Sequence, residues 1–197
     1  MKYLALGDSY TIGELVSYED NFPSQTCKML QAAGHPLSLD KLIAVTGWTT
    51  DELNAAIAKE KPGFDYDWVS LLIGVNNQYR GRSLDEYSWQ FYALLSQAIL
   101  FAKGNVKRVV VLSIPDWGLT PFNKKRDKKD TSELIDAFNA ENKKWSAHFG
   151  CHYIDITEST RVHAQDEDYL TSDGLHLSPK EYEIWANKLS QLILKNS

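Results

Sequence analysis

Three residues in this sequence have the types that nucleophilic catalysis requires. Ser9 follows a short apolar run near the amino terminus, and Asp173 and His176 lie together near the carboxyl terminus. A serine hydroxyl attacks well only when a base takes its proton, and the base works best when an acidic group orients it. Because Asp173 and His176 are so close in sequence, a single turn can point both side chains the same way. The three residues are therefore candidates for acyl transfer through Ser9.

Each of these residues also has a simpler interpretation. A serine after a strand is more often a turn or helix-capping residue, and an Asp shortly before a His is common. The favourable sign is that glycine and amide loops accompany them, with Gly47 and Asn76 each following another apolar run. By themselves Gly47 reads as a turn glycine and Asn76 as a loop cap. A nucleophile, an oriented base and two such loops together are the components of an acyl-transfer site.

The elements that must position these residues alternate between short apolar runs and amphipathic segments. This alternation predicts an α/β fold with a parallel sheet flanked by helices. The expected strands are residues 2–6, 39–45, 68–73, 108–114 and 153–156, and the expected helices are residues 22–33, 50–59, 84–103, 131–149 and 179–195. Loops at the carboxyl ends of parallel strands converge on one edge of the sheet, where ligands bind. Ser9, Gly47 and Asn76 follow the first three expected strands, so they should meet there.

Four sequence blocks together resemble the GDSL, or SGNH, hydrolases. They are Gly7-Asp8-Ser9-Tyr10, Gly47, Gly74-Val75-Asn76-Asn77 and Asp173-Gly174-Leu175-His176, in the family's order and spacing across nearly the whole chain. The resemblance implies a flavodoxin-like three-layer α/β/α sandwich with a five-stranded parallel sheet. It also implies a catalytic triad of Ser9, His176 and Asp173, and an oxyanion hole formed by the Ser9 amide, the Gly47 amide and the Asn76 side chain.

Two positions depart from the family pattern. The first block ends in Tyr10 where the family usually has Leu, and Asn77 stands where an Asp usually follows the block-three Asn. Neither change removes a reacting group. Asn77 keeps an acceptor oxygen but not the charge of an Asp. The sequence therefore leaves open which hydrogen bonds support this loop.

Length and charge exclude several function classes. The chain has 197 residues, 43% of them hydrophobic and 24% charged, with no linker-like stretch, so we expect a single domain over residues 1–197. The formal net charge of -5 argues against a nucleic-acid binder. No charged segment with a long apolar stretch begins the sequence, and no run approaches the ~20 apolar residues of a membrane span. The chain as it stands is expected to be cytoplasmic, unless a leader has been removed, and its partner a small-molecule ester.

Metal and cofactor chemistry has little support in the sequence. Cys27 and Cys151 form no ligand cluster, and small buried thiols are the expectation for both, with a disulfide left open. Asp8 beside Ser9 could join Asp173 and His176 around a metal, but no other carboxylates or histidines are spaced to complete such a site. We therefore expect no metal and no cofactor. Among the remaining histidines, His163 alone lies on the loop that leads to Asp173.

Aromatic residues near the predicted site give the first indication of a substrate. Tyr10, Trp48 and Trp117 lie in the site-edge loops and could frame a compact pocket, with Tyr79 a weaker candidate; the alternative is that they are packing anchors. The loop of residues 115–130 is long for such a fold, which is consistent with a lid. Its basic residues, Lys124, Lys125, Arg126, Lys128 and Lys129, suit a solvated loop or an attractor of anionic substrates.

The expected function is therefore a serine hydrolase that cleaves carboxylic esters, with short acyl groups on a carbohydrate or small alcohol as substrates. A lysophospholipase or thioesterase, and an acyltransferase that uses the same triad with a non-water acceptor, are the alternatives. A relative that only binds an acylated ligand would have lost part of the triad or oxyanion hole, whereas every such position is filled here.

Overall fold

Five parallel strands form the centre of the molecule, in the order β2-β1-β3-β4-β5. The computed structural model describes residues 1–124, 126 and 130–197. The strands are β1 (Lys2–Gly7), β2 (Ser38–Ala44), β3 (Trp68–Leu72), β4 (Val109–Leu112) and β5 (His152–Ile154). This is the flavodoxin-like strand order, so the predicted fold class is confirmed.

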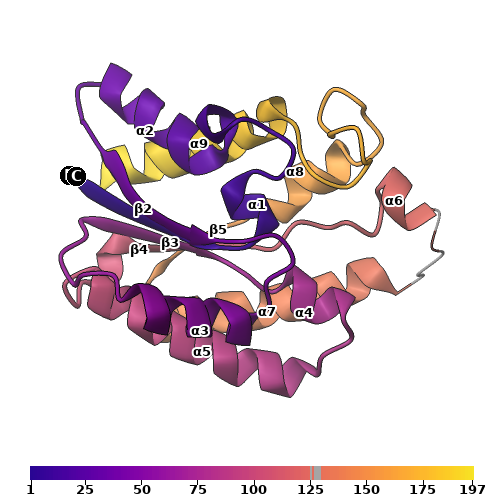
Figure 1. The fold of residues 1–197 in the computed structure, drawn as a ribbon, viewed down its shortest axis with the longest axis horizontal. Coiled ribbons are helices and arrows are strands. Elements are labelled where there is room, and N and C mark those ends of the chain that lie inside the picture. Colours follow the sequence, from indigo (N-terminus) through magenta and orange to yellow (C-terminus); the bar gives the residue numbers. More distant parts are fainter. Residues whose placement is uncertain (125, 127–129) are drawn as a thin grey trace.

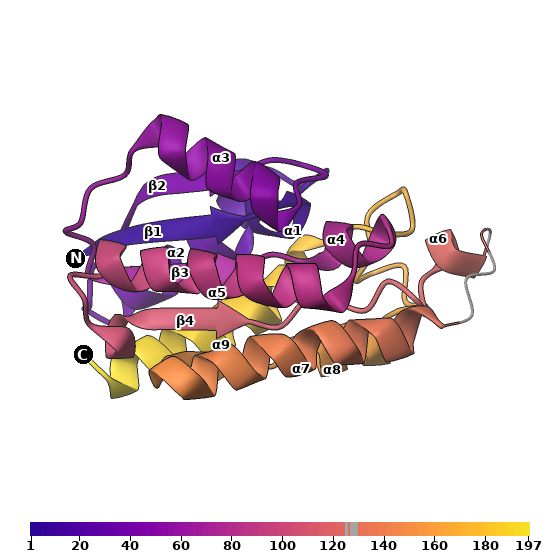
Figure 2. The same cartoon turned by 90° about the horizontal axis from the view of Figure 1, so that it is seen from below.

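Helices cover both faces of the sheet and complete the three layers (Figure 1). One face carries α2 (Phe22–Ala32), α8 (Thr157–Val162) and α9 (Pro179–Lys195), and the other carries α3 (Thr50–Glu60), α5 (Leu84–Phe101) and α7 (Thr131–Phe149). Seen from below, α3, α5 and α7 lie side by side across the sheet (Figure 2). Short helices α1 (Ser9–Ile12), α4 (Val75–Tyr79) and α6 (Pro121–Lys124) and two 3₁₀ turns, Tyr18–Asp20 and Val106–Arg108, lie in the connections.

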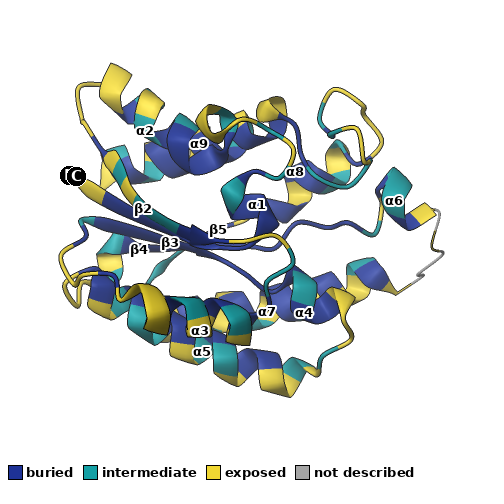
Figure 3. Ribbon diagram, in the orientation of Figure 1, coloured by how far each residue is buried: buried dark blue, intermediate teal, exposed yellow. Residues whose placement is uncertain are grey.

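The core lies between the sheet and the two helix layers. The strands and the inward faces of the helices are buried, whereas the outward helix faces are exposed (Figure 3). Trp68 and Leu71 of β3, Phe91 of α5 and Trp185 of α9 are among the side chains with almost no exposed surface. Because helices cover both faces of the parallel sheet, its strands are buried on both sides. The rigid core that results holds the connecting loops in place. No helix in the described ranges has the length and hydropathy needed to cross a membrane.

Candidate active site

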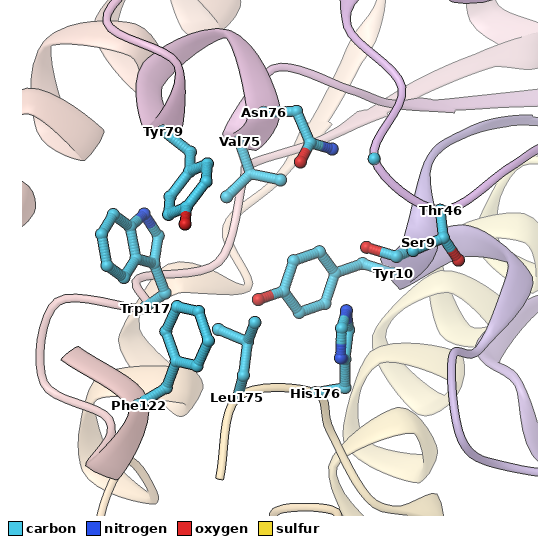
Figure 4. A pocket seen from close by; sticks show the side chains of 11 residues that line it. Ser9, Tyr10, Thr46, Val75, Asn76, Tyr79, Trp117, Phe122, Leu175 and His176 are labelled. Carbon is cyan, nitrogen blue, oxygen red and sulfur yellow. The ribbon is translucent and has the colours of Figure 1, made fainter. Parts of the chain in front are cut away.

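The predicted catalytic residues meet at the carboxyl edge of the sheet. Ser9 follows β1 and Asn76 follows β3, and these adjacent strands are connected to opposite sides, which makes the gap between them the topological switch point. A pocket of about 200 Å³ opens there (Figure 4). Ser9, Gly47, Asn76 and His176 all line it. Ser9 lies between the Asn76 amide and the His176 ring in this view.

The turn that carries Ser9 is built by its neighbours. Asp8 caps α1, because its Oδ1 accepts a hydrogen bond from the Tyr10 amide at 3.1 Å. A Cβ on Gly7 would lie 2.0 Å from the hydroxyl of Thr11 and 2.5 Å from the carbonyl oxygen of Leu72. Only glycine lets α1 fold back so tightly against the end of the sheet. Ser9 thus stands at the first position of α1 with only 3% of its surface exposed.

Asp173 and His176 form a hydrogen-bonded pair on the loop before α9. His176 Nδ1 lies 2.6 Å from Asp173 Oδ2, while Asp173 Oδ1 accepts from the amides of Leu175 at 2.8 Å and His176 at 2.9 Å. Partial burial raises the pKa of Asp173, but the bonds that it accepts, led by that from the His176 side chain, outweigh this and lower the pKa to about 2. An ionised Asp173 only accepts, so Nδ1 carries the proton and Nε2 is left as the basic nitrogen.

The Tyr10 ring supports His176 from the side of the pocket. The two rings lie 5.5 Å apart at 45°, and Tyr10 in turn packs against Trp185 at 6.5 Å. Among the described residues no hydrogen bond joins Ser9 Oγ to His176 Nε2. Such bonds are often long in ligand-free sites and shorten when substrate binds.

Gly47 occupies a tight turn after β2. The Trp48 amide donates to the Val45 carbonyl at 3.3 Å, and Gly47 has a φ of 84°. This left-handed conformation is the one that the third position of a type II turn requires, and glycine adopts it without strain. The turn places Gly47 in the pocket wall beside Ser9.

Asn76 and Asn77, which follow each other in α4, have different roles. Asn76 Nδ2 donates to the Trp48 carbonyl at 3.0 Å, so one N–H of this amide is used and the second is left for the pocket that Asn76 lines. Asn77 is fully buried and bonds twice to Thr50, the first residue of α3: its Oδ1 accepts from the Thr50 amide at 3.1 Å and its Nδ2 donates to the Thr50 hydroxyl at 2.7 Å. The neutral amide therefore holds the start of α3 without a charge.

Aromatic side chains form the wall of the pocket far from Ser9. Trp117 is 2% exposed, and its Nε1 donates to Gln78 Oε1 at 2.7 Å, which fixes the ring. Tyr79 meets Trp117 edge to face at 5.3 Å, and Phe122 does so at 6.0 Å. Of the predicted substrate contacts, Tyr10 and Trp117 line the pocket. Val75, Phe122 and Leu175, which also line it, were not predicted.

The prediction that Trp48 frames the pocket is wrong. Trp48 lines a separate hollow with Ala56 and Lys59 and packs against the core. The reason is local, because the turn that ends at Trp48 leads directly into α3 and turns the side chain toward that helix. Among the described residues, its one hydrogen bond to a residue that lines the Ser9 pocket is through its carbonyl group, which accepts from Asn76 Nδ2.

The predicted lid is a packed wall over residues 115–124. Asp116 is buried, accepts from the Arg161 guanidinium at 2.8 Å and from the Gly118 amide at 2.7 Å, and so ties this segment to α8. Phe122 accepts the Arg126 guanidinium over its ring at 3.9 Å. Of the basic run, Lys125, Lys128 and Lys129 lie outside the described residues.

His163 does not reach the pocket. Its Nδ1 lies 2.7 Å from the buried carboxylate of Glu181, and its ring stacks on Tyr169 at 3.8 Å. This pair links the end of α8 to the start of α9. Within the described ranges no three His, Cys, Asp or Glu side chains come together as metal ligands.

The fold is that of several solved hydrolases. The acetylxylan esterase Axe2 from Geobacillus stearothermophilus superposes with a TM-score of 0.77 at 18% identity, over 98% of this chain and 93% of that one. A lipase/acylhydrolase from Enterococcus faecalis gives a TM-score of 0.72 at 22% identity, over 98% and 94%. The psychrotrophic esterase EstA from a Pseudoalteromonas species gives 0.72 at 15%, over 98% and 97%.

Sequence comparison identifies the family. Residues 5–184 match the GDSL-like lipase/acylhydrolase family, so the chain belongs to that family. It is thus an enzyme of the esterase and lipase class, as the four sequence blocks predict. Among curated proteins none matches the sequence significantly.

Proposed function

We propose that this enzyme hydrolyses short acyl esters of a carbohydrate or small alcohol, with Ser9 as nucleophile, His176 as base and Asp173 as the group that orients it. The observation that carries the proposal is the Asp173–His176 bond of 2.6 Å beside a pocket that Ser9, Gly47 and Asn76 also line. Nucleophile, oriented base and amide donors are the parts that acyl transfer needs.

The proposed reaction has two halves. Ser9 Oγ attacks the acyl carbon while its proton passes to His176 Nε2, and the carbonyl oxygen becomes an oxyanion near the amides of Ser9 and Gly47 and the side chain of Asn76. Collapse of this adduct breaks the ester bond, and His176 returns the proton to the departing alcohol. Water then repeats the sequence against the acyl-enzyme, which releases the acid and restores Ser9.

Labelling tests the nucleophile directly. A fluorophosphonate should modify Ser9 covalently, because only an activated serine attacks such a reagent at neutral pH. Ser9→Ala should lose both labelling and turnover, whereas Ser172→Ala, which changes a serine on the loop beside Asp173, should keep both. Full activity in Ser9→Ala, or labelling at another serine, would reject the proposal.

The size and lining of the pocket support a short acyl group. A cavity of ~150 Å³ holds benzene, so about 200 Å³ has room for an acyl group of a few carbons and its reacting centre. Trp117, Tyr79 and Phe122 close the far end. The structural neighbours include both an acetylxylan esterase and a lipase/acylhydrolase, so the fold does not choose between short and long chains.

The acyl preference is measured as kcat/KM along p-nitrophenyl esters from acetate to palmitate. We expect a maximum at about two to four carbons and then a fall, whereas a long channel would add up to ~0.8 kcal/mol for each buried methylene. Phe122→Ala removes one wall side chain and should move the maximum to longer chains. Trp48→Ala, outside the pocket, should leave it in place. A steady rise to eight carbons or beyond in the wild type would instead favour a lysophospholipase or thioesterase.

A further inference from the structure

The two proposed oxyanion donors outside Ser9 stand on separate loops. Gly47 lies in the turn after β2, and Asn76 lies in α4 after β3. Neither donor belongs to a strand, so the sheet ladder does not set the distance between them. An oxyanion hole stabilises charge because its donors are fixed before the reaction begins. Some contact between these loops must therefore hold Gly47 relative to Asn76.

Arg80 makes such a contact. Its backbone caps the end of α4, with its amide donating to the Asn76 carbonyl at 3.0 Å. Its side chain reaches across to the other loop, where Nη2 donates to the Gly47 carbonyl at 2.6 Å. One residue thus bonds to the backbone of both donor residues. Arg80 is not among the residues that line the pocket.

The guanidinium of Arg80 is itself fixed at the start of α3. Nη1 lies 3.4 Å from the Glu52 carboxylate, which also accepts the Thr49 amide at 2.8 Å. That amide first, and then the Thr49 hydroxyl and the Arg80 guanidinium, lower the pKa of Glu52, so the carboxylate is charged at neutral pH. The planar fork of an arginine suits this double contact, whereas the single ammonium of a lysine cannot reproduce it.

Arg80 acts on Gly47 itself, whereas Asn76 holds the next residue of the turn through the Trp48 carbonyl. Outside Gly47 and its two chain neighbours, Arg80 Nη2 is the one heavy atom of the described residues within 4 Å of the place where a Gly47 Cβ would stand, at 3.7 Å. The Thr46 hydroxyl is bonded to the carboxylate of Glu14. Figure 4 shows Thr46 on the side of Ser9 away from the aromatic wall.

We propose that Arg80 is a positioning residue of the oxyanion hole, which it serves by holding the Gly47 turn at a fixed distance from Asn76. This inference rests on the proposed function of Ser9, Gly47 and Asn76. Arg80 does not touch the substrate, so its loss should weaken the stabilisation of the tetrahedral adduct and leave ground-state binding unchanged.

The test compares Arg80→Gln with Arg82→Gln. Arg82 is a matched control, because it too forms partly exposed ion pairs, with Asp51 at 3.4 Å and Glu86 at 2.9 Å, but its side chain bonds to neither Gly47 nor Asn76. With p-nitrophenyl acetate, Arg80→Gln should lower kcat by about tenfold to thirtyfold, less than the 10²- to 10³-fold loss of a whole donor, with KM within about twofold of wild type. Arg82→Gln should match the wild type. Arg80→Lys should fall between, since it keeps the charge but not the fork.

A second measurement separates positioning from general damage. An alkylboronic acid forms a tetrahedral adduct on an active serine, so its inhibition constant should rise in Arg80→Gln by the same factor as kcat falls. Both arginine variants lose exposed ion pairs of similar kind, so their melting temperatures should shift alike. A kcat in Arg80→Gln equal to that of Arg82→Gln, or a defect confined to KM, would overturn the inference. Neither result touches the proposed function, which is tested separately by the labelling of Ser9 and by the activity of Ser9→Ala.

Discussion

Asp173 and His176 belong to one loop, whereas Ser9, Gly47 and Asn76 come from the ends of different strands. The acid-base pair is closed by hydrogen bonds within four consecutive residues. The Ser9 side depends on contacts between loops that are far apart in sequence, such as those of Asn76 with Trp48 and Asn77 with Thr50. The comparison teaches that a local turn is enough to orient the proposed base, whereas the proposed oxyanion donors are placed by contacts between loops that the sheet brings together.

Each part of the site also has a carboxylate, Asp173 on the loop before α9 and Asp8 beside Ser9, and the two differ in their hydrogen bonds and in their pKa values. Asp173 accepts hydrogen bonds at both oxygens, and its pKa falls to about 2. Asp8 is fully buried, accepts one bond from the Tyr10 amide, and has no partner in the described chain for Oδ2. Burial therefore raises the pKa of Asp8 to about 7. Asp173 on the exposed loop is therefore fully charged at neutral pH, whereas the buried Asp8 beside Ser9 exchanges its proton near pH 7.

The largest expected effects fall on the acid-base loop. His176→Ala should lower kcat by about 10⁶-fold, because among the described residues no second histidine lines the pocket with Ser9. Asp173→Asn should lower it by about 10⁴-fold, because the amide cannot hold the same imidazole tautomer. The measurement is kcat on p-nitrophenyl acetate, with circular dichroism to show that both variants fold. Equal losses in the two variants would mean that the pair acts as one unit and that Asp173 does more than orient the ring.

Removal of the Asn76 side chain, which follows β3, should lower kcat by less than the loss of His176. Asn76→Ala is expected to lower kcat by roughly 10²- to 10³-fold with little change in KM, because the amide donates mainly to the oxyanion that forms after attack. Steady-state kinetics separate the two constants. A defect that lies wholly in KM would show that Asn76 binds the ground state, and the oxyanion assignment would then be wrong.

The same contrast explains what the sequence could predict. Long segments were predicted well, and α7 and α9 have the bounds expected for them. Helix α9 buries an apolar stripe, whereas α7 buries small polar side chains beside Ile135 and Phe138 and ends at Gly150 in the left-handed conformation. Helices α1, α4, α6 and α8 were not predicted, since a helix of four to six residues shows no such stripe. Their ends depend on caps and on contacts from elsewhere in the fold.

Within the site, motifs identified the residues that line the pocket nearest to Ser9, but not the residues that support them. Val75 and Leu175 lie inside the recognised blocks, so attention to the neighbours of Asn76 and His176 could have found them. Phe122 and Arg80 carry no local signal, because their contacts join loops that only the sheet order brings together. The prediction for Trp48 was wrong because an aromatic side chain in a site loop can point into the pocket or toward a neighbouring helix. The start of α3 directs Trp48 toward that helix.

The remaining prediction concerns stability, with no effect on catalysis at its centre, and is about Asp8. Its pKa in the folded protein is raised to about 7, above the ~3.9 of an unfolded chain. Between about pH 4 and pH 7 the folded state thus holds a proton that the unfolded state has lost, and the free energy of unfolding falls as pH rises, by up to roughly 1.4 kcal/mol per pH unit. Below pH 4 the contribution of Asp8 is constant.

Asp8→Asn keeps the Oδ1 acceptor and cannot ionise, so it should remove this fall in the free energy of unfolding. Its buried amide hydrogens cost about 1–3 kcal/mol, but they do so equally at every pH. The quantity to measure is therefore the effect of the substitution at pH 7 minus its effect at pH 4, from urea unfolding, which should favour the variant by a few kcal/mol. Asp85→Asn, on the exposed first turn of α5, is the control and should differ by no more than a few tenths of a kcal/mol between the two pH values. An Asp8→Asn effect that is the same at pH 4 and pH 7 would show that Asp8 stays ionised under Ser9, and that both halves of the site rest on charged carboxylates.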